Sequence, residues 1–270
     1  YQMTLSAGTS KHSQSRTAVL TFKTSNDSLA YMEVTQRPLG ISVIEDLLLF
    51  RDDVNAFADL RPWMDSDSTI HLLSDLDLSG IPNWIPIGLH TNAMLFSDKN
   101  SSIAGVFNGN NHTISNLSIT QTDYRSAGLF GYVKKAIIQD LTLDQSCSIT
   151  LETGQYQDLS AGGICGTLLG GTLSGCHFQG TIRLTGLSTT TATGGIAGEV
   201  NTDASHNASV ISDCSNNGTL QGLSPVGGIA AKLIGSSITA CQNNPGALVK
   251  GTGLEGGISG LSWTKGIIEN

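Results

Sequence analysis

A glycine-rich segment recurs five times from residue 127 onward, and this repeat limits the fold more than any other feature of the sequence. One copy, GGIAGEV, begins at Gly194, and related segments begin at Ala127, Gly162, Gly227 and Gly256. Aligned on their second glycine, the copies stand 35, 32, 33 and 29 residues apart, at Gly128, Gly163, Gly195, Gly228 and Gly257. Such near-even spacing is typical of a repeat architecture, in which each repeat is one structural unit.

A single copy of this segment would resemble a phosphate-binding loop, because glycine-rich turns let backbone N–H groups approach an anion. Phosphate loops do not recur five times in a small chain. No G-K-[ST] motif occurs, and no helical pattern follows any copy. The segment is therefore predicted to be structural, and we expect no cofactor.

Each repeat carries three short apolar segments bounded by Gly, Asn, Ser or Pro, which are too short for helices and read as strands. In the third repeat they are GGIAGEV, VISDCSN and GTLQG. Three strands that each match a counterpart in the next repeat predict an all-β, right-handed parallel β-helix with three strands per turn. A single turn cannot bury its own apolar face, so the stacking of turns creates the core.

Equivalent positions of the repeats line up as apolar columns, as a coil requires. Tyr132, Thr167, Glu199 and Lys232 lie between two such columns and are expected to point outward, with Glu199 and Lys232 as neighbours on adjacent turns. In the second strand, two apolar columns are three residues apart. This odd offset requires a bend or bulge between them. The bend is expected at Asn116, Asp140, Gly175, Asp213 and Ala240.

Two further columns are expected, one of cysteines inside the coil and one of asparagines. Cys176, Cys214 and Cys241 are predicted to stack as buried, reduced thiols, since an odd count of five cysteines and the lack of C-x-x-C suggest neither a disulfide framework nor a zinc site. Asn216 and Asn243 share a column and are expected to stack their amides. Phe178 follows Cys176 by two residues and is expected to face the core.

The segments FNGNNHTISNLSI, AGLFGYV, GGIAGEV, ISDCSNNGTL and VGGIAAKL together resemble the GLUG repeat, which is found in large bacterial surface and secreted proteins. The resemblance runs from about residue 41 to 270 and departs from the pattern at Ala231, where a glycine is expected. It implies a β-helix of adhesin-like type at the cell surface, either anchored to the outer membrane or secreted. Some members are IgA-specific metallopeptidases, but this chain lacks their H-E-x-x-H motif.

The chain divides into residues 1–38 and residues 39–270. The ending MEVTQRP, with Arg16 upstream, resembles the last strands of a BACON domain, an immunoglobulin-like sandwich of gut-bacterial surface proteins with a suspected carbohydrate-binding role. Only part of such a domain fits here. Residues 43–59 are predicted to form a helix that caps the open end of the coil, started by a capping box of Ser42 and Glu45. Its apolar stripe comprises Ile44, Leu47, Leu48, Val54, Phe57 and Ala58.

The net charge and the hydropathy of the chain argue against two classes of partner, nucleic acids and the membrane interior. A formal net charge of −8 argues against a nucleic-acid partner, which needs a basic face. No apolar run reaches the 18 residues of a membrane span. Because the chain begins at Tyr1 without an initiator Met or a signal peptide, we expect a processed or trimmed piece, consistent with a lipid anchor in a preceding segment. The chain is expected to be a monomer.

Catalytic and metal-binding residues are not evident in the sequence. The six histidines lack metal-ligand spacing, and Asp65 and Asp67 match a calcium loop less well than a solvated turn. Asp140 and Asp213 share the bend column but lie two turns apart, so they are expected to cap turns rather than to hydrolyse a glycosidic bond. Arg183 is expected to be exposed and solvated. We therefore predict no catalytic site, no metal site and no enzyme activity.

The predicted function is that of a non-catalytic extracellular adhesin-like module that binds a host or dietary glycan or a surface protein. The candidate ligand-binding residues are Tyr124 and Tyr156, which lie in polar connections one turn apart and would form a shared aromatic platform. Trp63 and Trp84 are assigned instead to the cap and the first turn. The alternatives are a polysaccharide lyase or hydrolase of the β-helix type and a purely structural spacer.

Overall fold

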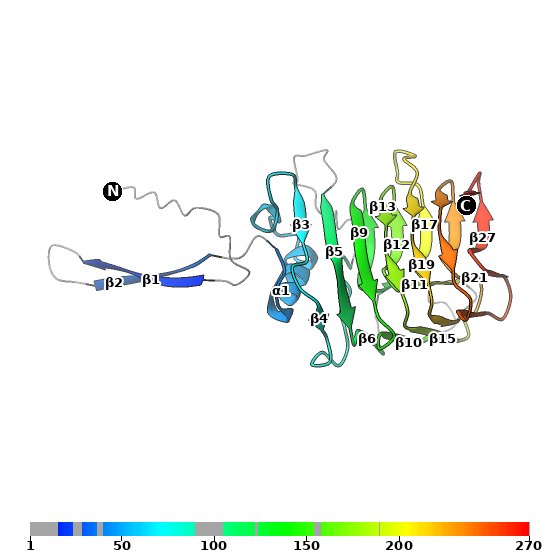
Figure 1. Ribbon diagram of the computed structural model, residues 1–270, viewed down its shortest axis with the longest axis horizontal. Coiled ribbons are helices and arrows are strands. Elements are labelled where there is room, and N and C mark those ends of the chain that lie inside the picture. The colour runs from blue at the N-terminus through cyan, green and yellow to red at the C-terminus, as the bar shows by residue number, and fades with distance from the viewer. Residues whose placement is uncertain are drawn as a thin grey trace.

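The structure is a computed structural model that describes residues 16–23, 29–36, 40–89, 105–121, 124–153, 158–188 and 190–269. The described residues from Ile41 onward form a coil of parallel strands of about five turns, closed at its N-terminal end by helix α1 (Ile44–Asn55) (Figure 1). A 3-10 turn, η1 (Arg61–Trp63), follows the helix. The all-β parallel β-helix predicted from the repeats is confirmed.

Four parallel sheets form the sides of the coil, and each turn adds strands to all of them. Each sheet is named here by one of its strands. The β10 sheet contains β6 (Ser118–Ile119), β10 (Ser148–Thr153), β15 (Thr181–Gly186), β20 (Thr219–Gln221) and β25 (Leu248–Lys250). The β11 sheet contains β7 (Ser126–Ala127), β11 (Leu159–Gly162), β16 (Thr191–Gly194), β21 (Val226–Gly227) and β26 (Glu255–Gly256). The β12 sheet contains β8 (Phe130–Lys134), β12 (Cys165–Leu169), β17 (Ala197–Asn201), β22 (Ala230–Ile234) and β27 (Ser259–Trp263).

The fourth sheet, the β9 sheet, is the longest side of the coil and has 11 strands. It contains β3 (Thr69–His71), β4 (Leu76–Asp77), β5 (Val106–Ser115), β9 (Ile137–Leu143), β13 (Thr172–Ser174), β14 (His177–Phe178), β18 (Val210–Ser212), β19 (Ser215–Asn216), β23 (Ser237–Thr239), β24 (Gln242–Asn243) and β28 (Ile267–Glu269). It bends along a column of left-handed residues at Asn116, Asp140, Gly175, Asp213 and Ala240, where φ lies between 50° and 59°. The predicted bend is confirmed at all five positions.

The glycine repeat is a chain reversal rather than one strand. In each of the five turns the predicted first strand splits into two, such as β16 and β17, which pack against each other through their backbones. A turn therefore contributes strands to four sheets, rather than the three strands per turn that the repeats predicted. A Cβ on Gly195 would lie within 3.0 Å of the Gly228 carbonyl oxygen and of the Asn216 side chain, and a Cβ on Gly163 would meet the Phe178 ring equally closely. Glycine is required at these positions because another backbone occupies the space of a side chain.

This reversal buries two side chains that were predicted to point outward. Thr167 and Tyr132 are buried, and the Thr167 and Ser126 hydroxyl oxygens lie 2.7 Å apart. The cause is that β7 and β11 fold back against β8 and β12. Glu199 and Lys232 are half-exposed and paired in register on β17 and β22, so the prediction that they are neighbours is confirmed.

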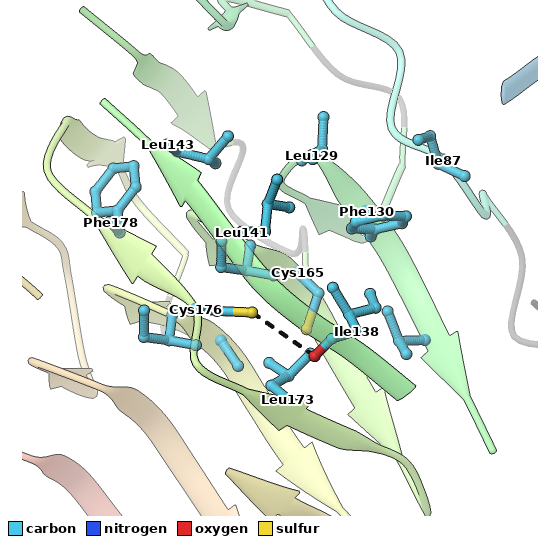
Figure 2. Packing of buried hydrophobic residues seen from close by; sticks show 14 of the residues in the cluster. Ile87, Leu129, Phe130, Ile138, Leu141, Leu143, Cys165, Leu173, Cys176 and Phe178 are labelled. Carbon is cyan, nitrogen blue, oxygen red and sulfur yellow. Dashed lines mark hydrogen bonds between the residues drawn. The ribbon is translucent and has the colours of Figure 1, made fainter. Parts of the chain in front are cut away.

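The core runs along the axis of the coil as columns of aliphatic side chains and thiols (Figure 2). Cys176, Cys214 and Cys241 stack on successive turns: the backbone N of Cys176 lies 3.4 Å from the Cys214 sulfur, and the backbone N of Cys214 lies 3.4 Å from the Cys241 sulfur. All five cysteines are free and buried. Phe178 is buried as predicted, beside the shared column of Asn216 and Asn243.

Helix α1 closes the coil with aromatic contacts. Phe50 packs edge-on against Trp63, with ring centroids 5.6 Å apart, and lies 6.0 Å from Phe107, which in turn contacts Phe130 at 5.2 Å. The cap predicted from the sequence is present, but its limits differ. The helix spans residues 44–55 rather than 43–59, and Asp46, not Glu45, accepts the backbone N–H groups of Ser42 and Val43.

The end of the helix removes two residues from the predicted apolar stripe. Phe57 adopts a left-handed backbone, with φ of 56°, and is 46 % exposed, and Ala58 is exposed as well. The chain leaves the helix at this point because Leu60 and Trp63 must turn inward to join Phe50. Phe50, which the stripe did not include, is the buried aromatic residue of the helix.

Strands β1 (Arg16–Lys23) and β2 (Leu29–Gln36) pair in an antiparallel sense, as the β segment expected before the coil (Figure 1). Residues 1–15, 24–28 and 37–39 of the BACON-like segment lie outside the described residues. A two-stranded hairpin has no second sheet to pack on, and is marginally stable by itself.

Candidate ligand-binding surface

The tyrosine platform expected from the sequence stays a prediction. Tyr124 is half-buried and lies two residues before β7, whereas Tyr156 lies outside the described residues. Beside Tyr124, Arg125 forms an exposed ion pair with Asp158 of the next turn, at 3.6 Å. This pair links the same two turns that the tyrosines were expected to bridge.

Trp63 and Trp84 belong to the cap and the first turn, as predicted, and are therefore not part of a surface platform. Both are buried: the Trp63 indole N–H donates to Asp53 at 2.9 Å, and that of Trp84 donates to the Leu129 carbonyl at 3.0 Å. The Arg51 guanidinium lies 5.2 Å from the centre of the Trp84 ring. Trp263 on β27 is different, because it is 67 % exposed.

The outer face of the β9 sheet is a broad polar surface that sequence reasoning did not identify. Two columns of half-exposed or exposed side chains run along it, one on each side of the bend. The first contains Asn108, Gln139, Ser174, Ser212 and Thr239, and the second contains Thr113, Thr142, His177, Ser215 and Gln242. Strands stack at about 4.8 Å, so five rungs span roughly 20 Å.

This surface, here called the polar ladder, is rich in hydrogen-bonding groups and carries little charge. Its ten side chains are hydroxyls, amides and one imidazole, and the His177 ring Nδ1 lies 2.8 Å from the Ser215 hydroxyl. The signal was present in the sequence, because Ser, Thr or Gln residues lie next to buried aliphatic residues in β9, β13, β18 and β23. A ladder of this kind offers donors and acceptors to a neutral ligand at a regular spacing.

Two carboxylates, those of Asp140 and Asp213, lie at the bend, between the two columns of the polar ladder. Asp140 and Asp213 both have left-handed backbones and are separated by the turn that holds Gly175. The Asp140 carboxylate accepts a hydrogen bond from the Gln139 side-chain amide at 3.1 Å and lies over Gly175, 2.7 Å from the position of a Cβ on that glycine. Short polar side chains tolerate this backbone, which supports the structural role predicted for both aspartates.

Other carboxylates near the N-terminal end of the coil bind their own turns. Asp65 accepts the backbone N–H groups of Asp67 and Thr69 at 2.8 and 2.9 Å, and its second oxygen lies 2.8 Å from His71 Nε2. Burial raises the pKa of Asp65, but the hydrogen bonds from His71 and from these N–H groups outweigh it, so the pKa is lowered. The Asp65 carboxylate therefore binds the backbone of its own turn and the side chain of His71.

Asp75 and Asp77 hold the next turn in a similar way. The Asp75 carboxylate accepts the backbone N–H of Thr113 at 2.8 Å and lies 3.0 Å from the ring of His112. The first of these bonds, followed by that with His112, lowers the pKa of Asp75. The Asn116 side chain donates to Asp77 at 2.7 Å, which lowers the pKa of Asp77. These groups tie adjacent turns together.

The part of the chain that the structure describes contains neither a cluster of metal ligands nor a thiol shown to be reactive. Within it, no group of three or more His, Cys, Asp or Glu side chains is placed to hold a metal ion. Burial raises the pKa of Cys147 to about 12, so this thiol stays protonated at neutral pH. Arg183 is exposed on β15, in a different sheet from the polar ladder, as the sequence suggested.

Comparison with known proteins supports the fold. No family model matches the chain, and no curated protein matches it. A solved structure from Bacteroides ovatus, described as that of a "putative immunoglobulin A1 protease", is similar with a TM-score of 0.52 and 18 % sequence identity. The similarity covers 84 % of this chain and 62 % of the solved chain, so the chain spans less than two thirds of its neighbour. Separately, none of the described helices is long and apolar enough to cross a membrane.

Proposed function

We propose that this chain is a non-catalytic, extracellular adhesin-like module that binds a neutral glycan or a surface protein along the polar ladder. The observation that carries the proposal is the ladder itself: ten aligned side chains without a carboxylate, ammonium or guanidinium group among them. Sugar hydroxyls are recognised by such donors and acceptors, and a repeating surface suits a repeating ligand. The resemblance to GLUG repeats supports a location at the bacterial surface.

The similarity to the Bacteroides ovatus structure supports the β-helix fold. At 18 % identity it is evidence for the fold and not for an activity. The name of that protein raises proteolysis as an alternative. This chain lacks an H-E-x-x-H motif, and its described carboxylates at residues 65, 75, 77 and 203 accept backbone N–H groups of turns. We therefore favour binding over catalysis.

A glycan array probed with the labelled chain tests the proposal. The variant Ser174→Glu with Ser212→Glu places two carboxylates on adjacent rungs of the ladder and is expected to weaken glycan binding at least about tenfold, through desolvation and loss of hydrogen bonds. The matched control, Thr181→Glu with Thr219→Glu, places the same charges on adjacent exposed positions of the β10 sheet and is expected to bind normally.

Several results would contradict the proposed binding site or the proposed function. Equal binding by both double variants would remove the polar ladder as the site, and loss of binding on Tyr124→Ala with Tyr156→Ala would assign it to the tyrosine pair instead. Failure of the unmodified chain to bind any glycan or surface protein would favour a structural spacer. Cleavage of an oligosaccharide in the same samples would favour a hydrolase or lyase.

A further inference from the structure

A column of aliphatic side chains runs beside the polar ladder on the outer face of the β9 sheet. It lies two residues before the first column of the ladder on each strand, and the residue between the two columns, such as Ile138 or Leu173, is fully buried. The new column therefore points away from the core. Its first four members are half-exposed and in register, and are here called the aliphatic stripe: Val106, Ile137, Thr172 and Val210.

The aliphatic stripe and the first column of the polar ladder together form a narrow strip with two different sides. Residues two apart on a strand are about 7 Å from each other, so methyl groups line one side of the strip and hydroxyl or amide groups line the other. Each turn adds one such pair of residues, as Thr172 with Ser174 and Val210 with Ser212. The strip therefore runs along the axis of the coil, across the strands, with a repeat of about 4.8 Å.

A pyranose ring has the same two-sided character, because C–H groups cover its faces and hydroxyl groups project from its edge. In an extended, unbranched polysaccharide each ring advances by roughly one rung of the strip. Successive rings can then repeat the same contacts on successive turns. An extended peptide matches less well, because it advances by about 3.3 Å per residue and presents a different side chain at each position. The spacing of the strip therefore favours a polysaccharide over a peptide segment.

The charges beside the strip favour a neutral ligand. Asp140 and Asp213 lie at the bend, one residue beyond the first column of the ladder, and would repel a carboxylate or sulfate group of an anionic glycan. Lys135 lies two residues before Ile137, and its ammonium group pairs with the Asp203 carboxylate at 3.2 Å. An anionic glycan would therefore meet like charge at the bend, and the cation at the other side of the strip is already engaged.

We propose that the ligand is an extended, unbranched, neutral polysaccharide of the β-1,4-linked class, which lies along the axis of the coil on this strip. The inference rests on the function proposed above and adds the class and the orientation of the ligand. C–H groups of the rings pack on the aliphatic stripe. Ring hydroxyls exchange hydrogen bonds with the first column of the ladder, at Asn108, Gln139, Ser174 and Ser212. Each turn of the coil thus binds one sugar unit.

Calorimetric titration of the complete chain with β-1,4-linked gluco- and manno-oligosaccharides of increasing length tests the proposal. Affinity should rise with each added unit, by about tenfold or more in total, and level off at about five units, because the strip then has no further rungs to offer. Oligosaccharides of the α-1,4-linked class coil instead of extending. At equal length they should bind at least about tenfold more weakly.

Ile137→Ser with Val210→Ser removes most of the aliphatic stripe and leaves the polar ladder intact. Serine already occupies the same column at residue 237, so the fold should tolerate the change and the melting temperature should fall by no more than a few degrees. Binding of the five-unit β-linked oligosaccharide should weaken about tenfold. Leu187→Ser is the matched control, because it changes an aliphatic side chain that is 75 % exposed and lies outside the strip, and it should bind normally.

The outcomes separate this inference from the proposed function. Affinity that levels off at two units, equal affinity for the α- and β-linked series, or unchanged binding by the folded double variant would each overturn the axial arrangement. Failure of all these oligosaccharides, together with binding of another glycan on the array or of a surface protein, would overturn the ligand class alone. Failure to bind in every one of these assays would overturn the proposed function as well.

Discussion

The residues of the bend column illustrate how a single backbone angle is repeated along the coil. The β9 sheet needs a left-handed residue in each turn, and the chain supplies asparagine, aspartate or glycine at four of the five positions. Ala240 is the exception, with φ of 50°. A left-handed backbone costs an alanine roughly 1 kcal/mol relative to glycine, because its Cβ approaches the following carbonyl.

Replacing Ala240 with glycine is therefore expected to raise the free energy of unfolding by about 0.5–1 kcal/mol. The gain is partly offset by the greater flexibility of glycine in the unfolded chain. Urea denaturation monitored by circular dichroism measures it. The reciprocal variant, Gly175→Ala, should be destabilising, because its Cβ would lie 2.7 Å from an Asp140 oxygen. Loss of stability in Ala240→Gly would contradict the strain argument.

Asn216 is a second residue whose role is local and specific. Its side chain is fully buried, donates to the Asn243 amide oxygen at 2.7 Å and accepts the backbone N–H of Gly218 at 3.0 Å. The stacked amides predicted from the sequence are thus confirmed. Asn216→Ala leaves the buried Gly218 N–H unpaired and removes the partner of the half-exposed Asn243 side chain, and should cost about 2 kcal/mol.

Asn217→Ala is the control for Asn216→Ala, because the Asn217 side chain is exposed. It should change the unfolding free energy by less than about 0.5 kcal/mol. Urea denaturation of the two variants under the same conditions gives the comparison. Equal effects would mean that the buried amide ladder contributes nothing beyond an exposed asparagine.

At the scale of elements, α1 and the loop after β17 stabilise the coil in different ways. The helix contributes an apolar face to the open end of the coil. The loop contributes a carboxylate: the Asp203 side chain has no exposed surface and lies 3.2 Å from Lys135 Nζ. It also accepts the backbone N–H groups of Ser205 and Asn207, at 2.8 and 2.9 Å.

Leu47→Asp is expected to detach the helix, because the side chain is fully buried and a carboxylate there would have no partner. Hydrogen exchange should rise first in β3, β4 and β5, and central strands such as β12 should stay protected, since solenoids fray from their ends. Phe57→Asp should have a much smaller effect, because Phe57 lies beyond the helix, is 46 % exposed and has a left-handed backbone that aspartate tolerates. Uniform loss of protection in Leu47→Asp would show that the helix does more than cap one end.

Asp203→Asn should lower the unfolding free energy by about 1–2 kcal/mol at neutral pH, because the hydrogen bonds to a charged acceptor weaken and the Lys135 pair is lost. The hydrogen bond from the Asn207 side chain is the largest cause of the lowered pKa of Asp203.

A lowered carboxyl pKa stabilises the fold fully above the ordinary value of 3.8, and this contribution is lost as the pH falls below it. The difference between wild type and variant should therefore be constant from about pH 5 upward and shrink in stronger acid. A difference that grows in acid would contradict this assignment.

For the whole molecule, the core exists only because turns stack. Gly195 shows this most directly, since its backbone lies against Gly228 of the next turn and Asn216 of its own. A methyl group there cannot be accommodated without separating two turns. The close stacking of the turns therefore requires glycine at positions such as Gly195, in addition to the apolar columns of the core.

Gly195→Ala should reduce the free energy of unfolding by about 3 kcal/mol, with faster hydrogen exchange on both sides of the altered turn, in β12 and β22. Gly80→Ala, where nothing lies within 4 Å of the Cβ position, is the control and should be neutral. Differential scanning calorimetry combined with hydrogen exchange distinguishes the two. Similar melting curves for both variants would show that the turns are not close-packed at Gly195.

The sequence by itself determined the repeat unit, the parallel stacking, the bend residues, the buried Cys column and the shared column of Asn216 and Asn243, because a stacked coil displays one column per repeat position. These patterns are local in each turn and periodic along the chain, so one sequence suffices to read them. The helical cap was also visible, as an apolar stripe next to the first repeat.

Only the tertiary structure decided where the chain folds back on itself. The glycine segments reverse direction, which splits one expected strand into two and buries Thr167 and Tyr132. Helix α1 ends at Asn55 because Trp63 must reach Phe50. The polar ladder, likewise, becomes one surface only when five turns align their outward residues. Contacts between turns about 30 residues apart set these features, and no short stretch of sequence records them.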